Sequence, residues 1–199
     1  QVVDTAMVDG AAILMSMFYS MQGAGSLKNE RGSNVLDGGA HFYGTYETSD
    51  GEFISVGSIE PQFYALLLEK TGLDPEVFSA QMDQNRWPEY KDKVAQVFRT
   101  KTRDEWREIM EGSDVCFAPV LSTAEVADHP HNIARSTFVE LDDMVQPAPA
   151  PRFSRTEVGV THGSRIAGED TSEVLSGIGY SDSEISSLVA SGAVSLVPT

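Results

Sequence analysis

The stretch from residue 4 to residue 22 constrains the fold most, because it reads as a helix with apolar side chains on nearly every side. An apolar stripe at helical spacing is formed by Val8, Ala11, Ala12, Met15, Phe18 and Tyr19, and it is widened by Ile13, Leu14, Met17 and Met21. A helix of this kind is buried on most of its sides. We predict one helix, capped by Asp4, which packs on structure that this chain does not contain.

Two residues interrupt the apolar pattern of this helix. Asp9 and Gly10 stand between apolar neighbours, and a buried aspartate needs hydrogen-bond partners. Asp9 is therefore either a structural hydrogen-bonding residue or part of a site, and the pattern leaves both interpretations open.

Residues 40–143 have the pattern of a compact α+β body built on a hairpin. Two alternating apolar runs flank Ser49-Asp50-Gly51, which is typical of a β-hairpin. Helices are predicted over 61–71, ending at Gly72, and twice within 87–114, where Thr102 and Glu105 form a capping box. Residues 115–121 predict a short apolar strand, and a brief helix follows before residue 129.

The segments on either side of this body are less compact. Residues 22–40 read as a long loop, and the alternating prolines of residues 145–155 predict an extended tether followed by a last helix at Ser181. We therefore expect a linker helix with a crossing loop at 1–39, a small α+β domain at 40–143, and a C-terminal tether with helices at 144–199.

The charge of the chain excludes several classes of partner. A net charge of −16 repels the phosphates of nucleic acids and of anionic membranes, so neither is an expected partner. No apolar run reaches the roughly 20 residues that span a bilayer. A single cysteine excludes an internal disulfide framework, so we expect a cytoplasmic protein. The chain starts at Gln1 and enters a helical pattern directly, which we interpret as a fragment of a longer protein.

The histidines and the cysteine offer little evidence of chemistry. His129 and His131 flank Pro130 in a pattern that suits a turn rather than a metal site, and His41 and His162 are expected at the surface. Cys116 lies on the apolar strand, which favours a buried structural cysteine over a nucleophile.

Glu60 occupies an unusual position between an apolar strand and an apolar helix. It precedes Pro61, and proline is favoured at the first helical position, so Glu60 could be a helix cap. Glutamate is nevertheless not among the favoured N-cap residues, and its side chain is long enough to reach elsewhere. The residues alone leave a cap and a site role equally open.

Several runs carry a family resemblance, namely QVVDTAMVDGAAIL, NVLDGGAHFYGTYETSDGEFISVGSIEPQFYALLLEKTGL, RWPEYKDKVAQVFRTKT and SDVCFAPVLSTAEVADHPHN. In these runs the chain resembles the class III CoA-transferase family, and IEPQFY together with SDVCFAPV is specific to its racemase branch, the α-methylacyl-CoA racemases. The resemblance covers nearly the whole chain and is looser near the C-terminus, where Asp170 stands at a position that is commonly histidine.

The resemblance implies a fold and an assembly. Family members have a large domain, with an α/β portion, and a small α+β domain, and two subunits interlock so that each active site lies between domains of different subunits. This chain matches the second half: a linker helix, the small domain and a C-terminal return segment, without the upstream α/β part. An interlocked homodimer is implied.

The resemblance also implies an activity. The racemases invert 2-methylacyl-CoA thioesters by removing and returning an α-proton, with CoA as part of the substrate and no other cofactor or metal. The acid/base histidine and aspartate belong to the upstream half, while Glu60 matches the active-site glutamate that supports the histidine. Asp9 matches an aspartate near the pocket, and Lys28 and Arg31 are the basic candidates for contacting CoA. The alternatives are a class III CoA-transferase and, for this fragment alone, a non-catalytic dimerisation module.

Overall fold

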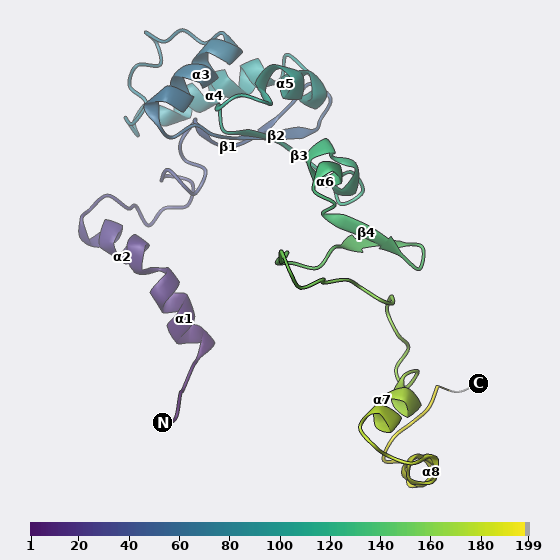
Figure 1. Ribbon diagram of the computed structural model, residues 1–199. Coiled ribbons are helices and arrows are strands. Elements are labelled where there is room, and N and C mark those ends of the chain that lie inside the picture. Colours follow the sequence, from purple (N-terminus) through teal and green to yellow (C-terminus); the bar gives the residue numbers. More distant parts are fainter. Residues whose placement is uncertain (198–199) are drawn as a thin grey trace. The chain divides into compact units, whose positions relative to one another are not determined.

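The computed structural model describes residues 1–197 (Figure 1). Its internal contacts divide the chain into two units, one formed by residues 1–121 and one that starts at residue 122. We describe each unit by itself.

The first unit is built on a three-stranded antiparallel sheet. Strands β1 (Tyr43–Glu47), β2 (Phe53–Gly57) and β3 (Phe117–Val120) lie in the order β1-β2-β3. Tyr43 pairs with Gly57 across the first ladder, and Ser55 pairs with Ala118 across the second. The predicted hairpin around residues 49–51 and the predicted strand near residue 117 are therefore both confirmed.

Three helices cover one face of this sheet (Figure 1): α3 (Pro61–Thr71), α4 (Trp87–Phe98) and α5 (Arg103–Met110). Helix α3 ends, as predicted, at Gly72, whose left-handed conformation (φ 70°) favours glycine. Helix α5 begins with the predicted capping box between Thr102 and Glu105. The α+β fold class is confirmed by this arrangement.

The core of the unit lies between the helices and the sheet. Alternation along the strands sends one set of side chains toward the helices, and the fully buried residues include Phe42, Ile54, Leu67, Val94, Phe98, Met110 and Val115. The opposite face of the sheet carries the exposed or half-buried residues Tyr43, Thr45, Phe53, Ser55, Gly57, Ala118 and Val120. This uncovered face bears the candidate site.

The N-terminal apolar stretch differs from its prediction in two respects. It forms two helices, α1 (Met7–Leu14) and α2 (Ser16–Gly23), and the hydroxyl of Ser16 donates to the carbonyl oxygen of Ile13 at 2.6 Å. Such a side-chain bond competes with the helical ladder, which accounts for the break. The N-cap is Ala6 rather than Asp4, and it has no side-chain capping bond.

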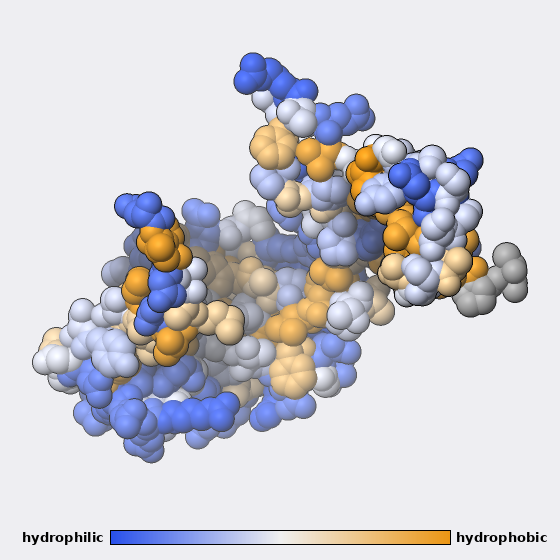
Figure 2. Space-filling model, turned by 90° about the horizontal axis from the view of Figure 1, so that it is seen from below, coloured by the Kyte–Doolittle hydropathy of each residue, from blue (hydrophilic) through white to orange (hydrophobic). Residues whose placement is uncertain are grey.

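Neither α1 nor α2 contains a buried residue, which agrees with the expectation that this stretch packs on structure outside this chain. Figure 2 shows apolar side chains, in orange, reaching the molecular surface. Among the most exposed are Met7, Val8, Ile13 and Leu14, at 72% to 94% exposure. An apolar composition is therefore not sufficient to bury a helix.

The second unit begins with short elements: a 3-10 helix η1 (Val126–Asp128), α6 (Pro130–Ala134), and the antiparallel strands β4 (Phe138–Leu141) and β5 (Met144–Pro147). His129 is the N-cap of α6, which corrects the predicted turn at HPH. The β4–β5 hairpin was not predicted, and it places residues 145–147 in a strand rather than in a tether. The predicted boundary between residues 143 and 144 falls within this hairpin, while the division into domains remains a prediction.

Two helices follow in the second unit, α7 (Thr171–Gly177) and α8 (Asp182–Ala190). Ser181 and Glu184 form the predicted capping box of α8, and Ile185 is the buried residue of this helix. Within residues 1–197, no helix combines the length and the apolar character needed to cross a bilayer.

Candidate functional site

The structure places Glu60 at the N-cap position of α3, with extended backbone angles (φ −70°, ψ 144°) and Pro61 in the first turn. Its side chain makes no capping hydrogen bond and is exposed. Within residues 1–197, its carboxylate forms no hydrogen bond or ion pair with another side chain. A capping role for the carboxylate is therefore not observed, and Glu60 is free to meet a group outside this chain.

The turn that leads to Glu60 is held firmly by the sheet. Gly57 donates its N–H to the carbonyl oxygen of Cys116 at 2.8 Å, and Ser58 donates its N–H to that of Phe42 at 2.9 Å. The hydroxyl of Ser58, which is fully buried, donates to the carbonyl oxygen of Val115 at 2.6 Å. The strand ends on both sides of β2 thus fix the start of the turn.

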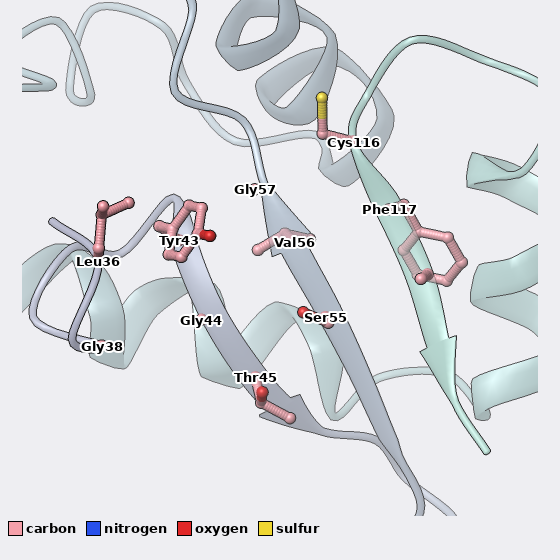
Figure 3. A pocket seen from close by; sticks show the side chains of 11 residues that line it. Leu36, Gly38, Tyr43, Gly44, Thr45, Ser55, Val56, Gly57, Cys116 and Phe117 are labelled. Atoms are coloured by element: carbon pink, nitrogen blue, oxygen red, sulfur yellow. The ribbon is translucent and has the colours of Figure 1, made fainter. Parts of the chain in front are cut away.

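A hollow of about 530 Å³ lies on the uncovered face of the sheet, beside this turn (Figure 3). Its floor consists of small residues on the three strands, Gly44, Thr45, Ser55, Gly57 and Ala118, and its rim includes Leu36, Tyr43 and Cys116. A Cβ at position 57 would lie 3.5 Å from the Tyr43 ring, which is an ordinary van der Waals contact. The hollow has a mixed lining that suits a ligand with both apolar and polar groups.

Cys116 lies at the edge of this hollow and is exposed, which corrects the prediction of a buried structural cysteine. Its φ of 56° places it in the left-handed region at the start of β3, so simple strand alternation does not describe its side chain. Partial burial raises the pKa of the thiol, and the negative charges of Glu60 and Asp114 raise it further. A thiol with a raised pKa is a poorer nucleophile at neutral pH than one with a lowered pKa.

His41 is buried in the core rather than exposed as predicted, and it does not reach the hollow. It is fully buried, its Nε2 lies 2.7 Å from the Tyr64 hydroxyl, and that hydroxyl donates to the carbonyl oxygen of Phe78 at 3.0 Å. Since Tyr64 has one proton, His41 is the donor from Nε2, which leaves Nδ1 as an unpartnered acceptor. Burial lowers the pKa of His41 to about 4.

Asp9 is exposed in the first turn of α1. Among the described residues, its carboxylate forms no hydrogen bond or ion pair, and none connects it with Glu60. The structure therefore does not bring the two predicted site residues together, and the role of Asp9 stays a prediction.

Lys28 and Arg31, the predicted basic candidates, line a second hollow of about 390 Å³ in the same unit. Phe18, Met21 and Leu27 form much of its apolar wall. The loop around it is ordered by Asn34, whose amide nitrogen donates to the carbonyl oxygen of Lys28 at 2.9 Å and to Asp37 at 2.8 Å. The lining combines the basic Lys28 and Arg31 and the acidic Glu30 and Asp37 with an apolar surface.

The residues described by the structure contain no group of three His, Cys, Asp or Glu side chains that could hold a metal ion. In the HPH motif, Nδ1 of His129 accepts a hydrogen bond from the N–H of His131 at 3.3 Å. His162 is exposed, as predicted.

Sequence reasoning located Glu60 but missed the hollow beside it. The alternating runs predicted the hairpin, but only the pairing of β2 with the segment around β3 brings Gly57 and Cys116 together. It also missed Gln81, whose side chain contacts the turn before Glu60.

Comparison with known proteins assigns the family. The model of CoA-transferase family III matches residues 1–171. The chain is 48% identical to α-methylacyl-CoA racemase of Mus musculus and 44% identical to that of Homo sapiens, in each case over 93% of this chain and 49% of the relative. The fold is also similar to a CAIB/BAIF family protein from Brucella suis, with a TM-score of 0.63 and 19% identity over 89% of this chain and 48% of that one. The chain thus spans about half the length of these relatives, the resemblance noted from its motifs is confirmed, and the chain belongs to CoA-transferase family III.

Proposed function

We propose that this chain is part of an α-methylacyl-CoA racemase, which inverts carbon 2 of a 2-methylacyl-CoA thioester. The observation that carries the proposal is the identity of 48% and 44% with two named racemases over 93% of this chain. The carboxylate of Glu60, which makes no capping hydrogen bond, follows a turn that starts at Gly57 on the edge of the hollow, and this supports the same assignment.

The chemistry explains why a carboxylate is needed at this point. The thioester carbonyl makes the α-proton acidic by delocalising the charge of the enolate, and inversion needs acid/base groups on opposite faces of the carbon. By family resemblance these groups are a histidine and an aspartate in the half that this chain does not include. A carboxylate that accepts the N–H of an imidazole orients the ring and stabilises its protonated form. We assign this supporting role to Glu60.

The hollow beside Glu60 is proposed as one wall of the acyl site. Leu36 and Tyr43 supply apolar contact area, while Thr45 and Ser55 supply polar groups on the floor. The raised pKa of the Cys116 thiol keeps it neutral, so that it does not attack the thioester. Lys28 and Arg31 are proposed to attract the phosphates of CoA to this acidic chain, and Asp9 is proposed to lie near the completed pocket.

The test is the variant Glu60→Gln in the full-length protein that contains this chain. We expect kcat and kcat/KM for α-proton exchange to fall together by roughly ten- to a hundredfold, because a supporting group acts mainly in the transition state. Deuterium uptake at carbon 2 of a 2-methylacyl-CoA in D₂O measures the rate. Glu69→Gln removes an exposed carboxylate from the same helix and is the matched control.

The same assay separates the alternatives. If the full-length protein moves CoA to an added free carboxylic acid without exchanging the α-proton, it is a CoA-transferase. If it does neither, the chain belongs to a non-catalytic module. If Glu60→Gln exchanged the α-proton at the normal rate but had a lowered melting temperature, the role of Glu60 would be purely structural.

We further infer an interlocked homodimer that acts in the cytoplasm and needs no metal or cofactor beyond the CoA of its substrate. The isolated 199-residue chain is then expected to be inactive. Light scattering of the full-length protein measures the subunit number, and unchanged proton exchange after dialysis against a chelator tests the independence from metal.

A further inference from the structure

The turn before Glu60 is contacted by one side chain from outside the sheet. Gln81, in the segment between α3 and α4, donates its amide nitrogen to the carbonyl oxygens of Ser58 at 3.2 Å and of Ile59 at 2.8 Å. We propose that Gln81 is a positioning residue that fixes the direction in which Glu60 leaves the turn. This inference rests on the proposed role of Glu60.

The chemistry of the contact requires an amide. Both partners are carbonyl oxygens, which only accept, so the NH₂ group is the one part of the glutamine that can bind them. A glutamate of the same shape would place carboxylate oxygens against carbonyl oxygens. A methionine of similar length would leave two carbonyl groups without this donor.

Gln81 is itself anchored to the core. Its backbone carbonyl oxygen accepts a hydrogen bond from Nε1 of Trp87 at 2.8 Å, and Trp87 is 2% exposed. The hydrogen bonds with Phe42 and Val115 reach Ser58, and the N–H of Ile59 donates to the carbonyl oxygen of Gly57 at 2.9 Å. Gln81 adds a bond to the carbonyl oxygen of Ile59, and so it contacts the last peptide before Glu60.

The side chain of Glu60 needs such support, although its backbone is held on the helix side, where its carbonyl oxygen accepts the N–H groups of Phe63 at 3.0 Å and of Tyr64 at 2.9 Å. Among the described residues its carboxylate has no hydrogen-bond partner, and a glutamate side chain loses considerable rotamer freedom when it is fixed. A firm backbone limits the region that the carboxylate explores, and small misplacements of catalytic groups have large effects on rate.

Cys116 provides a readout that is independent of activity. Its carbonyl oxygen binds the N–H of Gly57 at 2.8 Å, so it lies against the same turn. After burial, the negative charge of Glu60 is the next cause that raises the pKa of the Cys116 thiol, ahead of Asp114. The thiol pKa therefore reports how close the Glu60 carboxylate lies.

The experiment is a double-mutant cycle of Glu60→Gln and Gln81→Met in the 199-residue chain. The pH dependence of Cys116 alkylation by iodoacetamide gives the thiol pKa of each variant. We expect Glu60→Gln to lower the thiol pKa when Gln81 is present, and roughly half or more of that shift to be lost in Gln81→Met, because coupled residues are not additive. Gln84→Met, in the same segment and also half-buried, is the matched control and is expected to leave the shift intact.

Two results would overturn the proposal. One is an undiminished effect of Glu60→Gln in the Gln81→Met background. The other is no effect of Glu60→Gln in either background, which would mean that the carboxylate does not lie near this turn. Should Gln81→Met fail to fold, Gln81→Asn keeps the amide but shortens its reach, and the same two outcomes apply to it.

An activity measurement in the full-length protein adds a second arm. Gln81→Met is expected to lower kcat for proton exchange several-fold with KM unchanged, and to cost little further rate once Glu60 is glutamine. If Gln81→Met lowered kcat by the same factor in the Glu60→Gln background as in the wild-type protein, the proposal would be contradicted. If the wild-type protein exchanges no proton, the proposed function fails, and the cysteine measurement still decides whether Gln81 positions Glu60.

Discussion

Two apolar regions of the first unit differ in burial. Helices α1 and α2 contain no buried residue, whereas the layer between the sheet and α3, α4 and α5 contains Phe42, Val94 and Phe98 at 0% exposure. Both regions are rich in apolar side chains. The difference is that the sheet and its three helices present apolar surfaces to each other, whereas most apolar side chains of α1 face no such surface among residues 1–121.

This contrast shows what burial requires. The free energy of the hydrophobic effect comes from apolar area removed from water, so it depends on a partner surface and not on composition. The core also contains polar groups that are satisfied internally, such as the hydroxyl of Tyr46, which donates to the carbonyl oxygen of His41 at 2.5 Å. The three predictions below test this division between the arm, which is α1 with α2, and the core.

The largest effect is expected from a cavity in the core. Phe98→Ala removes a fully buried ring that packs against Trp106, with a centroid distance of 5.1 Å, so the free energy of unfolding should fall by about 3–5 kcal/mol. Leu14→Ala, in the arm, removes a side chain that is 82% exposed and should change it by less than about 0.5 kcal/mol. Urea unfolding followed by tryptophan fluorescence measures both. A comparable loss for Leu14→Ala would mean that the arm is packed in solution.

The next effect is a dependence on pH that originates in the core. The pKa of His41 is about 4 in the folded chain and 6.5 in the unfolded one, so the unfolded chain binds more protons between these values. Stability should therefore be complete above pH 6.5 and fall as the pH drops toward 4, by at most about 3 kcal/mol.

Urea unfolding at several pH values measures this slope. His41→Gln should flatten it between pH 6.5 and 4.5, while His162→Gln, which changes an exposed histidine, should not. An unchanged slope in His41→Gln would show that other groups cause the loss.

The smallest effect concerns helix capping in the two regions. Thr102→Ala breaks the capping box of α5, in which the Thr102 hydroxyl accepts the N–H of Glu105 at 3.2 Å, and should cost about 1 kcal/mol. Ala6→Ser gives α1 the cap that it lacks and should raise helicity by circular dichroism without changing the unfolding free energy of the core. A stabilised core in Ala6→Ser would show that the arm and the core unfold together.

Local signals predicted local structure well. Ser49-Asp50-Gly51 marked the first hairpin, Pro61 and Gly72 marked the two ends of α3, and Thr102 with Glu105 marked the start of α5. Each signal acts through backbone groups within a few residues, and so it can be read from neighbours in the chain. The β4–β5 hairpin was missed because recurring prolines suggested an extended tether, although Pro147 lies at the end of β5.

The candidate site was only partly predictable for the same reason. Glu60 was found because a long acidic side chain stood where a short capping residue is favoured. Its neighbours Cys116 and Gln81 lie 56 and 21 positions further along the chain, and no local pattern relates them to it. The burial of His41 was missed because its partners, Tyr64 and Phe78, come from later segments.

Short runs of residues predicted the α+β class, the hairpin, the ends of α3, the capping boxes and the membership of CoA-transferase family III, since each depends on neighbours in the chain. Contacts between distant segments expose Cys116, bury His41 and place Gln81 against the turn before Glu60, and these could not be predicted in the same way. Exposure and side-chain contacts follow from which distant segments pack together, and that packing is the sum of many weak interactions across the chain.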